Sequence, residues 1–177
     1  MEWELLNAEE VVRCHVFNLW RHRSRSPRTG EVHDFDVIES RDWVNVVPIT
    51  TDQQLVLIRQ YRHAIAAVTL EIPGGIIDPQ DASPRHAGAR ELLEETGYAA
   101  AELLPLGVIH PNPATHTNRC HMFLARAARP VSEPRWDGTE EIAVQLVPVT
   151  QLAQLISEGA ITHALAVAAL LLAQSHL

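Results

Sequence analysis

The sequence contains no lysine, so all fourteen of its basic residues other than histidine are arginine. Twenty-two acidic residues outnumber them and give the chain a formal net charge of −8 at pH 7. A basic surface supplies most of the affinity of general nucleic-acid-binding proteins. We therefore expect no nucleic-acid partner.

Cysteine and long hydrophobic runs are also scarce. Cys14 and Cys120 can form at most one bridge, which argues against a disulfide framework. The most apolar run, residues 164–173, is about half the ~20 residues that a transmembrane helix needs, and it predicts a buried C-terminal helix. The first residues lack the basic and apolar regions of a signal peptide. These absences predict a cytoplasmic protein with no membrane partner.

The length and composition are those of a single globular domain. The chain has 177 residues, of which 46% are hydrophobic and 20% are charged, so it can bury a substantial core but is short for two ordinary domains. We predict one domain over residues 1–177. Within it we expect an N-terminal strand region over about residues 1–40 and a larger core over about residues 44–177.

Most of the first seventy residues have the pattern of strands joined by polar turns. Residues 21–30 contain Arg21, Arg23, Arg25 and Arg28 together with proline and glycine, and we predict a hairpin loop there. Such a run could contact RNA or phosphate, but a solvated loop is the more common arrangement. The apolar stretches 43–49 and 54–61 predict strands of a sheet core.

The middle of the chain has clear signals for a strand, a turn and a helix. A short strand over residues 68–72 leads into Pro73-Gly74-Gly75, where paired glycines let the backbone turn sharply and approach a ligand. Ser83 and Pro84 predict the start of a helix, and Gly97 predicts its end. Further strands are expected over residues 103–110, 121–126 and 142–147, and further helices over residues 150–157 and 162–174.

The predicted helix has an unfavourable charge pattern. Residues three and four apart lie on one helix face, so Glu91 is expected beside Glu94 and Glu95. Each such like-charge pair costs a few tenths of a kcal/mol, and acidic residues in the last turn also oppose the helix dipole. Arg90 can neutralise only part of this charge. A solvated acidic face is the ordinary explanation, but the preceding Pro-Gly-Gly turn favours a site for Mg²⁺ or Mn²⁺ that also takes phosphate oxygens.

The residues from Arg90 to Tyr98 resemble the second half of the Nudix hydrolase signature, G-x5-E-x7-R-E-U-x-E-E-x-G-U, in which U is a bulky apolar residue. The first half departs from this pattern. The sixth residue after Gly75 is Asp81 rather than Glu, and eight residues separate Asp81 from Arg90. Either Asp81 replaces the first Glu beside a one-residue insertion, or strict spacing puts Ala82 there.

The resemblance implies an α/β fold, an α/β/α sandwich with a mixed central sheet, preceded here by the N-terminal antiparallel strand region. It also implies that a divalent metal, Mg²⁺ or alternatively Mn²⁺, is held by Glu91, Glu94, Glu95 and the carbonyl of Gly74. In the family the first acidic residue of the signature mainly supports the loop and helix. Metal-activated water would then attack one phosphorus of a diphosphate.

Softer cues resemble the ADP-ribose pyrophosphatase branch of that family. They are Gln60-Tyr61-Arg62, the run from Leu70 to Gly75, Pro113 beyond the signature, and the run from Glu158 to Ala164. The branch implies that Arg62 contacts substrate phosphates, although a surface ion pair is equally consistent with the sequence. Glu71 could face the ligand or pair with Arg90. Arg119 is a further candidate for substrate binding.

The resemblance places the catalytic base on a late loop, where Asp137, Glu140 and Glu141 compete and Glu140 is favoured. Glu91, Glu140 and Glu141 form the predicted catalytic set. The expected reaction is hydrolysis of ADP-ribose or a related nucleoside diphosphate sugar to a nucleoside monophosphate and a sugar phosphate, by a homodimer. The alternatives are a hydrolase of nucleoside triphosphates or dinucleoside polyphosphates, and a Nudix-fold sensor that binds a nucleotide sugar without cleaving it.

Overall fold

The computed structural model describes residues 2–136 and 141–176, which form two compact units. The N-terminal unit comprises the chain up to Asp42 together with His110–Arg119. The core unit comprises Trp43–Ile109 and the chain from Cys120 onward.

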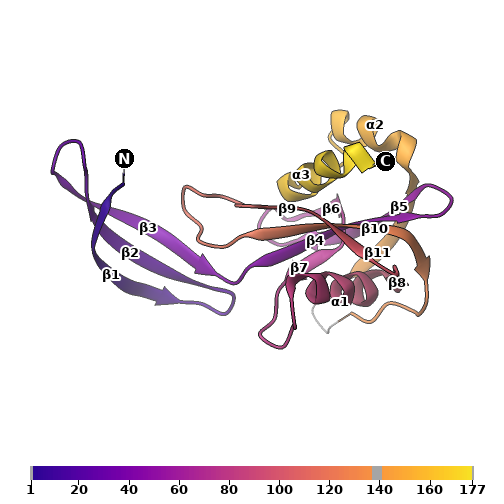
Figure 1. The fold of residues 1–177 in the computed structure, drawn as a ribbon, viewed down its shortest axis with the longest axis horizontal. Coiled ribbons are helices and arrows are strands. Elements are labelled where there is room, and N and C mark those ends of the chain that lie inside the picture. The colour runs from indigo at the N-terminus through magenta and orange to yellow at the C-terminus, as the bar shows by residue number, and fades with distance from the viewer. Residues whose placement is uncertain (1, 137–140, 177) are drawn as a thin grey trace. The chain divides into compact units, whose positions relative to one another are not determined.

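The N-terminal unit is built on a three-stranded antiparallel sheet of order β1-β2-β3. Its strands are β1 (Glu4–Arg13), β2 (Phe17–Arg25) and β3 (Val32–Ser40) (Figure 1). Every residue of β1 is exposed. All the buried apolar side chains among the described residues belong to the core unit, so this sheet has no hydrophobic core of its own.

The arginine-rich stretch is not mainly a loop, so the prediction of a hairpin loop over residues 21–30 is wrong in its first half. Residues 21–25 belong to β2, and only the turn beyond Arg25 is irregular. The strand accommodates these arginines because each lies opposite an acidic residue on a neighbouring strand, where opposite charges are compatible with sheet pairing. The pairs are Arg21 with Asp36, Arg23 with Asp34, and Arg25 with Glu4, at N–O distances of 3.3, 2.8 and 2.9 Å.

The core unit is organised around an eight-stranded mixed sheet with the main order β11-β5-β4-β10-β8. Strand β6 also pairs with β5, β7 with β4, and β9 with β10. Only β4 and β10 run parallel among these pairs. The strands are β4 (Trp43–Thr50), β5 (Gln54–Arg62), β6 (Ala67–Glu71), β7 (Gly74–Ile76), β8 (Tyr98–Ala99), β9 (Leu103–Ile109), β10 (Cys120–Pro130) and β11 (Ile142–Pro148).

Helices cover both faces of this sheet (Figure 1). Helix α1 (Pro84–Thr96) packs through Ala87 and Leu92 on a cluster that includes Val44 and Val46. The other face carries a larger cluster that includes α3 (Ala164–Ala173). Two faces covered by helices and a mixed sheet confirm the predicted α/β/α sandwich.

The C-terminal helices are short. The single-turn 3₁₀ helix η1 (Val149–Gln151) leads into α2 (Leu152–Ser157), and η2 (Gln174–His176) follows α3. The buried residues of α3 confirm that the apolar run near the C-terminus is a core helix. Within the described ranges, no helix combines the length and apolarity needed to cross a membrane.

Candidate functional site: a carboxylate helix beside a glycine turn

Helix α1 is delimited by the caps that the sequence predicts. The side chain of Ser83 accepts a hydrogen bond from the backbone N–H of His86, and Pro84 occupies the first turn. At the other end Gly97 has φ 73°, and its N–H donates to the carbonyl of Leu93. A β-carbon on Gly97 would also lie 2.1 Å from the carbonyl oxygen of Ser132. These caps hold the acidic residues in the last two turns.

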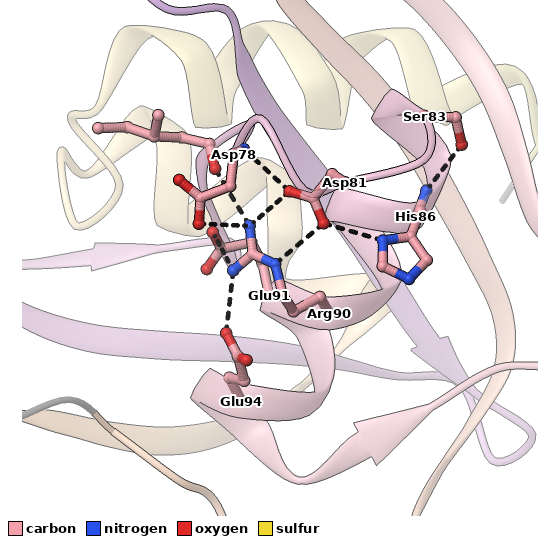
Figure 2. A network of polar contacts seen from close by, with 8 residues as sticks. Asp78, Asp81, Ser83, His86, Arg90, Glu91 and Glu94 are labelled. Atoms are coloured by element: carbon pink, nitrogen blue, oxygen red, sulfur yellow. Dashed lines mark hydrogen bonds and ion pairs between the residues drawn. The ribbon is translucent and has the colours of Figure 1, made fainter.

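Arg90 lies at the centre of a network of acidic side chains (Figure 2). Its Nη1 donates to Glu91 at 2.9 Å and to Glu94 at 3.0 Å. Its Nε and Nη2 donate to Asp81, and Nη2 also donates to the carbonyl of Ile76. The i, i+4 pair of Arg90 with Glu94 is therefore present as the sequence predicts. The hydrogen bonds that Arg90 donates to Asp81 are the main reason why the pKa of Arg90 is raised, so the guanidinium stays charged.

Asp81, not Ala82, performs the supporting role that the family assigns to its first acidic residue. Its side chain is buried and accepts hydrogen bonds from the Arg90 guanidinium and from the backbone N–H of Asp78, and it contacts the His86 ring at 2.8 Å. Hydrogen bonds from Arg90 hold the pKa of Asp81 well below its usual range. The extra residue before Arg90 is thus absorbed in the loop, and the shorter carboxylate still reaches the guanidinium.

Glu95 points toward the glycine turn. It is almost fully buried, and its Oε2 accepts a hydrogen bond from the N–H of Gly74 at 2.8 Å. The turn itself approaches closely: a β-carbon on Gly75 would lie 2.6 Å from Oε1 of Glu91, and one on Gly74 would lie 2.2 Å from the carbonyl oxygen of Val44. The chain bends at Pro73, within the turn that the sequence predicts, and the two glycines then open the short strand β7, which pairs with β4. This pairing brings the turn against α1.

The carboxylate and carbonyl oxygens gathered here have the chemistry that binds a divalent cation. Glu91 and Glu94 accept hydrogen bonds from the same nitrogen of Arg90, so their carboxylates share one positive group. Glu95, on the same helix, accepts a hydrogen bond from the N–H of Gly74. Carboxylate and carbonyl oxygens are the ligands that Mg²⁺ and Mn²⁺ prefer. Across residues 2–136 and 141–176, no three acidic, histidine or cysteine side chains are gathered as a metal site. Arg90 and the Gly74 N–H hold the carboxylates in the arrangement seen here.

The segment from Val131 to Trp136 covers the C-terminal end of α1. The carbonyl of Gly97 accepts from the N–H groups of Val131 and Ser132, and the carbonyl of Glu94 accepts from the N–H of Arg135. The indole N–H of Trp136 donates to the carbonyl of Glu95 at 3.1 Å. Carbonyls at a helix end have no partner within the helix, so these contacts satisfy them. They also tie α1 to the chain that leads into the predicted base loop.

The residues of the predicted base loop are only partly described. The favoured base Glu140, like Asp137, lies outside the described residues. Glu141 is exposed and directly precedes β11. The assignment of the base therefore stays a prediction.

Arg62 and Glu71 form an ion pair on neighbouring strands. Two guanidinium nitrogens of Arg62 donate to the two carboxylate oxygens of Glu71 at 2.8 and 2.7 Å. Burial alone would raise the pKa of Glu71, but hydrogen bonds from Arg62 and Thr69 outweigh it and lower the pKa. Glu71 therefore binds Arg62 rather than Arg90, and its predicted contact with the ligand stays a prediction. The Arg62 side chain remains partly exposed.

His163 joins this pair, and sequence reasoning missed it. Its Nε2 lies 3.7 Å from Glu71, and its Nδ1 accepts a hydrogen bond from the N–H of Ala166 at the start of α3. A polar residue directly before the apolar run was the available signal. Histidine is not among the usual N-cap residues, so the signal was weak.

Arg119 belongs to the N-terminal unit, unlike the other predicted site residues. Its backbone N–H donates to Asp42 at 2.8 Å, and its guanidinium binds the same carboxylate. Asp42 therefore holds Arg119 within its own unit. Its predicted contact with substrate stays a prediction.

Comparisons with known proteins agree with this geometry. Residues 39–170 match the NUDIX domain family. The chain is 26% identical over 171 residues to an ADP-ribose pyrophosphatase of Mycobacterium tuberculosis, covering 96% of this chain and 82% of that protein. It is 28% identical over 174 residues to the ADP compounds hydrolase NudE of Escherichia coli, covering 98% and 92%. A crystal structure of an ADP compounds hydrolase superposes with a TM-score of 0.89 at 26% identity, covering 100% of this chain and 95% of that one.

Proposed function

This chain belongs to the Nudix family and is a hydrolase, and from that premise we propose that it cleaves the diphosphate bond of ADP-ribose or a related nucleoside diphosphate sugar. The products are a nucleoside monophosphate and a sugar phosphate. The relatives named for ADP-ribose and ADP compounds align over most of the chain and support this substrate class. The same family membership supports a requirement for a divalent metal.

The observation that carries the proposal is the group of three glutamates held by one arginine and one glycine turn. Glu91 and Glu94 share Arg90, and Glu95 binds the turn at Gly74. We assign these carboxylates, with the carbonyl of Gly74, as the ligands of Mg²⁺ or Mn²⁺. When bound, the metal neutralises charge on the phosphates and lowers the pKa of water.

The residues of the chain supply orientation and proton transfer. We assign Arg62, which is held by Glu71, to bind a phosphate oxygen of the substrate. The oxygen of one water forms a bond to one phosphorus while the bond from that phosphorus to the bridging oxygen breaks. The electron pair leaves with the second phosphate group, and the proton of the water passes to the loop acid, for which we retain Glu140 over Glu141.

A substrate panel tests this function. The protein is incubated with and without Mg²⁺ or Mn²⁺ and with ADP-ribose, ADP-glucose, GDP-mannose, NADH, diadenosine polyphosphates and nucleoside triphosphates, and the products are identified. We expect metal-dependent release of a nucleoside monophosphate from one or more of the sugar nucleotides. Preferential cleavage of a triphosphate or a dinucleoside polyphosphate would replace the proposed substrate class. Tight binding without turnover would point to the sensor.

We also propose that the working form is a homodimer assembled through the N-terminal unit. Its sheet has no buried apolar residue among those described, yet it exposes large side chains. Trp3, Leu5 and Phe35 are examples, with 48, 55 and 43% of their surface accessible. A second copy that covers them would remove this apolar surface from water.

A further inference from the structure

His86, in the first turn of α1, contacts the same Asp81 carboxylate that supports Arg90 (Figure 2). Its Nδ1 lies 2.8 Å from Oδ1 of Asp81, which also accepts a hydrogen bond from Nε of Arg90 at 3.2 Å. The other oxygen, Oδ2, accepts hydrogen bonds from Nη2 of Arg90 and from the N–H of Asp78, both at 2.9 Å. Two side chains therefore hold this buried carboxylate in place, His86 and Arg90.

The contact fixes which nitrogen of His86 carries a hydrogen. Hydrogen bonds from Arg90 are the main reason why the pKa of Asp81 lies well below its usual range, so its carboxylate is ionised and only accepts. Nδ1 of His86 must therefore be the donor, in the neutral ring as well as in the charged one. A hydrogen bond to an ionised acceptor is stronger than one between neutral groups. His86 can thus hold Asp81 firmly although its own side chain is exposed.

The backbone of the first turn places this ring. Ser83 is the N-cap and Pro84 is the first residue of α1, so His86 is the third, and its N–H donates to Ser83 at 3.2 Å. In a capping box, a Glu or Gln at this position reaches back to the N-cap. Here the imidazole reaches back beyond the cap, to the side chain of Asp81. His86 and Arg90 are four residues apart, so they bind this carboxylate from one face of the helix.

The contact lies where the chain departs from the Nudix signature. Asp81 stands in place of a Glu, and the stretch between it and Arg90 is one residue longer. Its carboxylate is thus carried by a shorter side chain on a longer loop. Each added contact removes orientations that such a side chain could otherwise adopt. The hydrogen bond from His86 at Oδ1 keeps both carboxylate oxygens directed at the Arg90 guanidinium.

We propose that His86 is a positioning residue for the metal site and that it acts by fixing the orientation of Asp81. Asp81 in turn fixes the guanidinium of Arg90, whose Nη1 holds Glu91 and Glu94 beside each other. The proposal rests on the proposed function, because it concerns carboxylates that we assign there as metal ligands. Without His86 these carboxylates are less well ordered, so metal binding has to order them and becomes weaker.

Binding of Mn²⁺ without substrate, followed by electron paramagnetic resonance, tests the proposal without any chemical step. We expect His86→Ala, which removes the donor, to weaken Mn²⁺ binding about three- to tenfold. Groups that contact a metal ligand directly contribute roughly ten- to hundredfold, and His86 acts through two intervening side chains. His86→Asn puts an amide N–H near the position of Nδ1, so Mn²⁺ affinity should stay within about twofold of the wild type.

Arg85→Ala is the matched control. Arg85 is the exposed neighbour of His86 in the same turn, and its replacement by alanine changes helix propensity in a similar region without touching Asp81. We expect its Mn²⁺ affinity to equal that of the wild type. Urea denaturation of each variant shows that the protein is folded under the conditions of the titration.

NMR of ¹⁵N-histidine-labelled protein detects the contact itself. The His86 signal is identified by its absence from the spectrum of His86→Asn. At a pH at which the ring is neutral, its hydrogen should be on Nδ1, because that nitrogen faces Asp81. A neutral His86 ring with its hydrogen on Nε2 would overturn the proposal.

The Mn²⁺ titration separates this role from the proposed function. Equal Mn²⁺ affinity in His86→Ala and Arg85→Ala would overturn the role of His86 even if the wild type hydrolyses sugar nucleotides. A loss in His86→Asn as large as that in His86→Ala would overturn it too, because the hydrogen bond would then not be the cause. Weaker Mn²⁺ binding in His86→Ala alone, in a protein that cleaves none of the nucleotides of the substrate panel, would support the positioning role and overturn the hydrolytic function.

Discussion

Arg90 contacts acidic side chains on both sides, Asp81 in the preceding loop and Glu91 and Glu94 on its own helix. A single guanidinium therefore fixes the loop and orients two of the three proposed metal ligands. The two kinds of contact differ in burial. Asp81 is almost completely buried, whereas Glu94 is nearly half exposed, so removing their charges should have different consequences.

Removal of the Asp81 charge should cost stability. Asp81→Asn keeps the shape of the side chain but places a donor amide where an acceptor oxygen faced Arg90 and the N–H of Asp78. We therefore expect the free energy of unfolding to fall by about 2 kcal/mol. Urea denaturation measures it. Asp78→Asn is the control, because Asp78 lies 3.8 Å from Arg90 and is partly exposed, so its effect should stay within about 0.5 kcal/mol. Equal losses in the two variants would contradict the role given to Asp81.

Removal of the ligand charges should cost activity instead. Glu94→Gln and Glu95→Gln should each lower kcat at least about a hundredfold, because an oxygen ligand of the metal loses its charge. In Glu95→Gln the amide oxygen can still accept the hydrogen bond from Gly74, and in Glu94→Gln the changed side chain is nearly half exposed. The urea midpoint should therefore change little in both variants. Glu102→Gln, an exposed substitution in the same unit, is the control. Activity and Mn²⁺ binding, followed by electron paramagnetic resonance, that stay near wild type in both variants would refute the metal assignment.

At the scale of whole elements, α1 and α3 begin in different ways. The N-terminus of α1 is capped by Ser83, which stays neutral at all ordinary pH values, whereas that of α3 is capped by His163. The cap needs an unprotonated Nδ1, because that nitrogen accepts the N–H of Ala166. Burial is the main reason why the pKa of His163 falls below 6.5, and the nearby Arg62 adds to this, while Glu71 opposes it.

The α3 cap should therefore respond to pH. Because the pKa of His163 is lower in the folded state, the unfolded chain binds the proton first, and stability is retained above about pH 6.5 and lost as the pH falls below it. His163→Asn retains a capping oxygen that does not titrate. Urea midpoints measured across this range should fall less steeply for His163→Asn than for the wild type. His110→Asn, at an exposed position, should leave the slope unchanged; a His163→Asn slope equal to the wild-type slope would contradict the prediction.

At the scale of the whole molecule, the two units differ in how they are stabilised. The core unit buries two apolar clusters, one under α1 and one under α3. The N-terminal unit relies on sheet hydrogen bonds and on exposed ion pairs such as Arg23 with Asp34, which individually contribute little. A sheet with so little buried surface is expected to need additional contacts.

The homodimer that we propose would supply such contacts, and sedimentation velocity can detect it. We expect the wild type to sediment as a dimer. A Trp3→Glu, Phe35→Glu double variant should sediment as a monomer, because dimerisation would have to bury the two new charges in the interface. Leu171→Glu introduces the same charge at an exposed position on α3 and should leave the dimer intact. A monomeric wild type, or a double variant that remains a dimer, would refute this interface.

The sequence by itself determined the local features of this protein. The caps at Ser83 and Gly97, the spacing of Glu91, Glu94 and Glu95, and the apolar run of α3 all act within a few residues, and the structure confirms both caps and the buried helix. The family and the α/β/α fold followed from the order of residues around the acidic helix.

Only the tertiary structure decided which distant groups meet. Asp81 reaches Arg90 despite its displaced spacing, Glu71 binds Arg62 rather than Arg90, and the arginines of β2 pair across strands instead of forming a loop. A sequence pattern states which groups seek partners, but the choice among possible partners depends on strand register and helix packing, and these are set by the burial of the whole core.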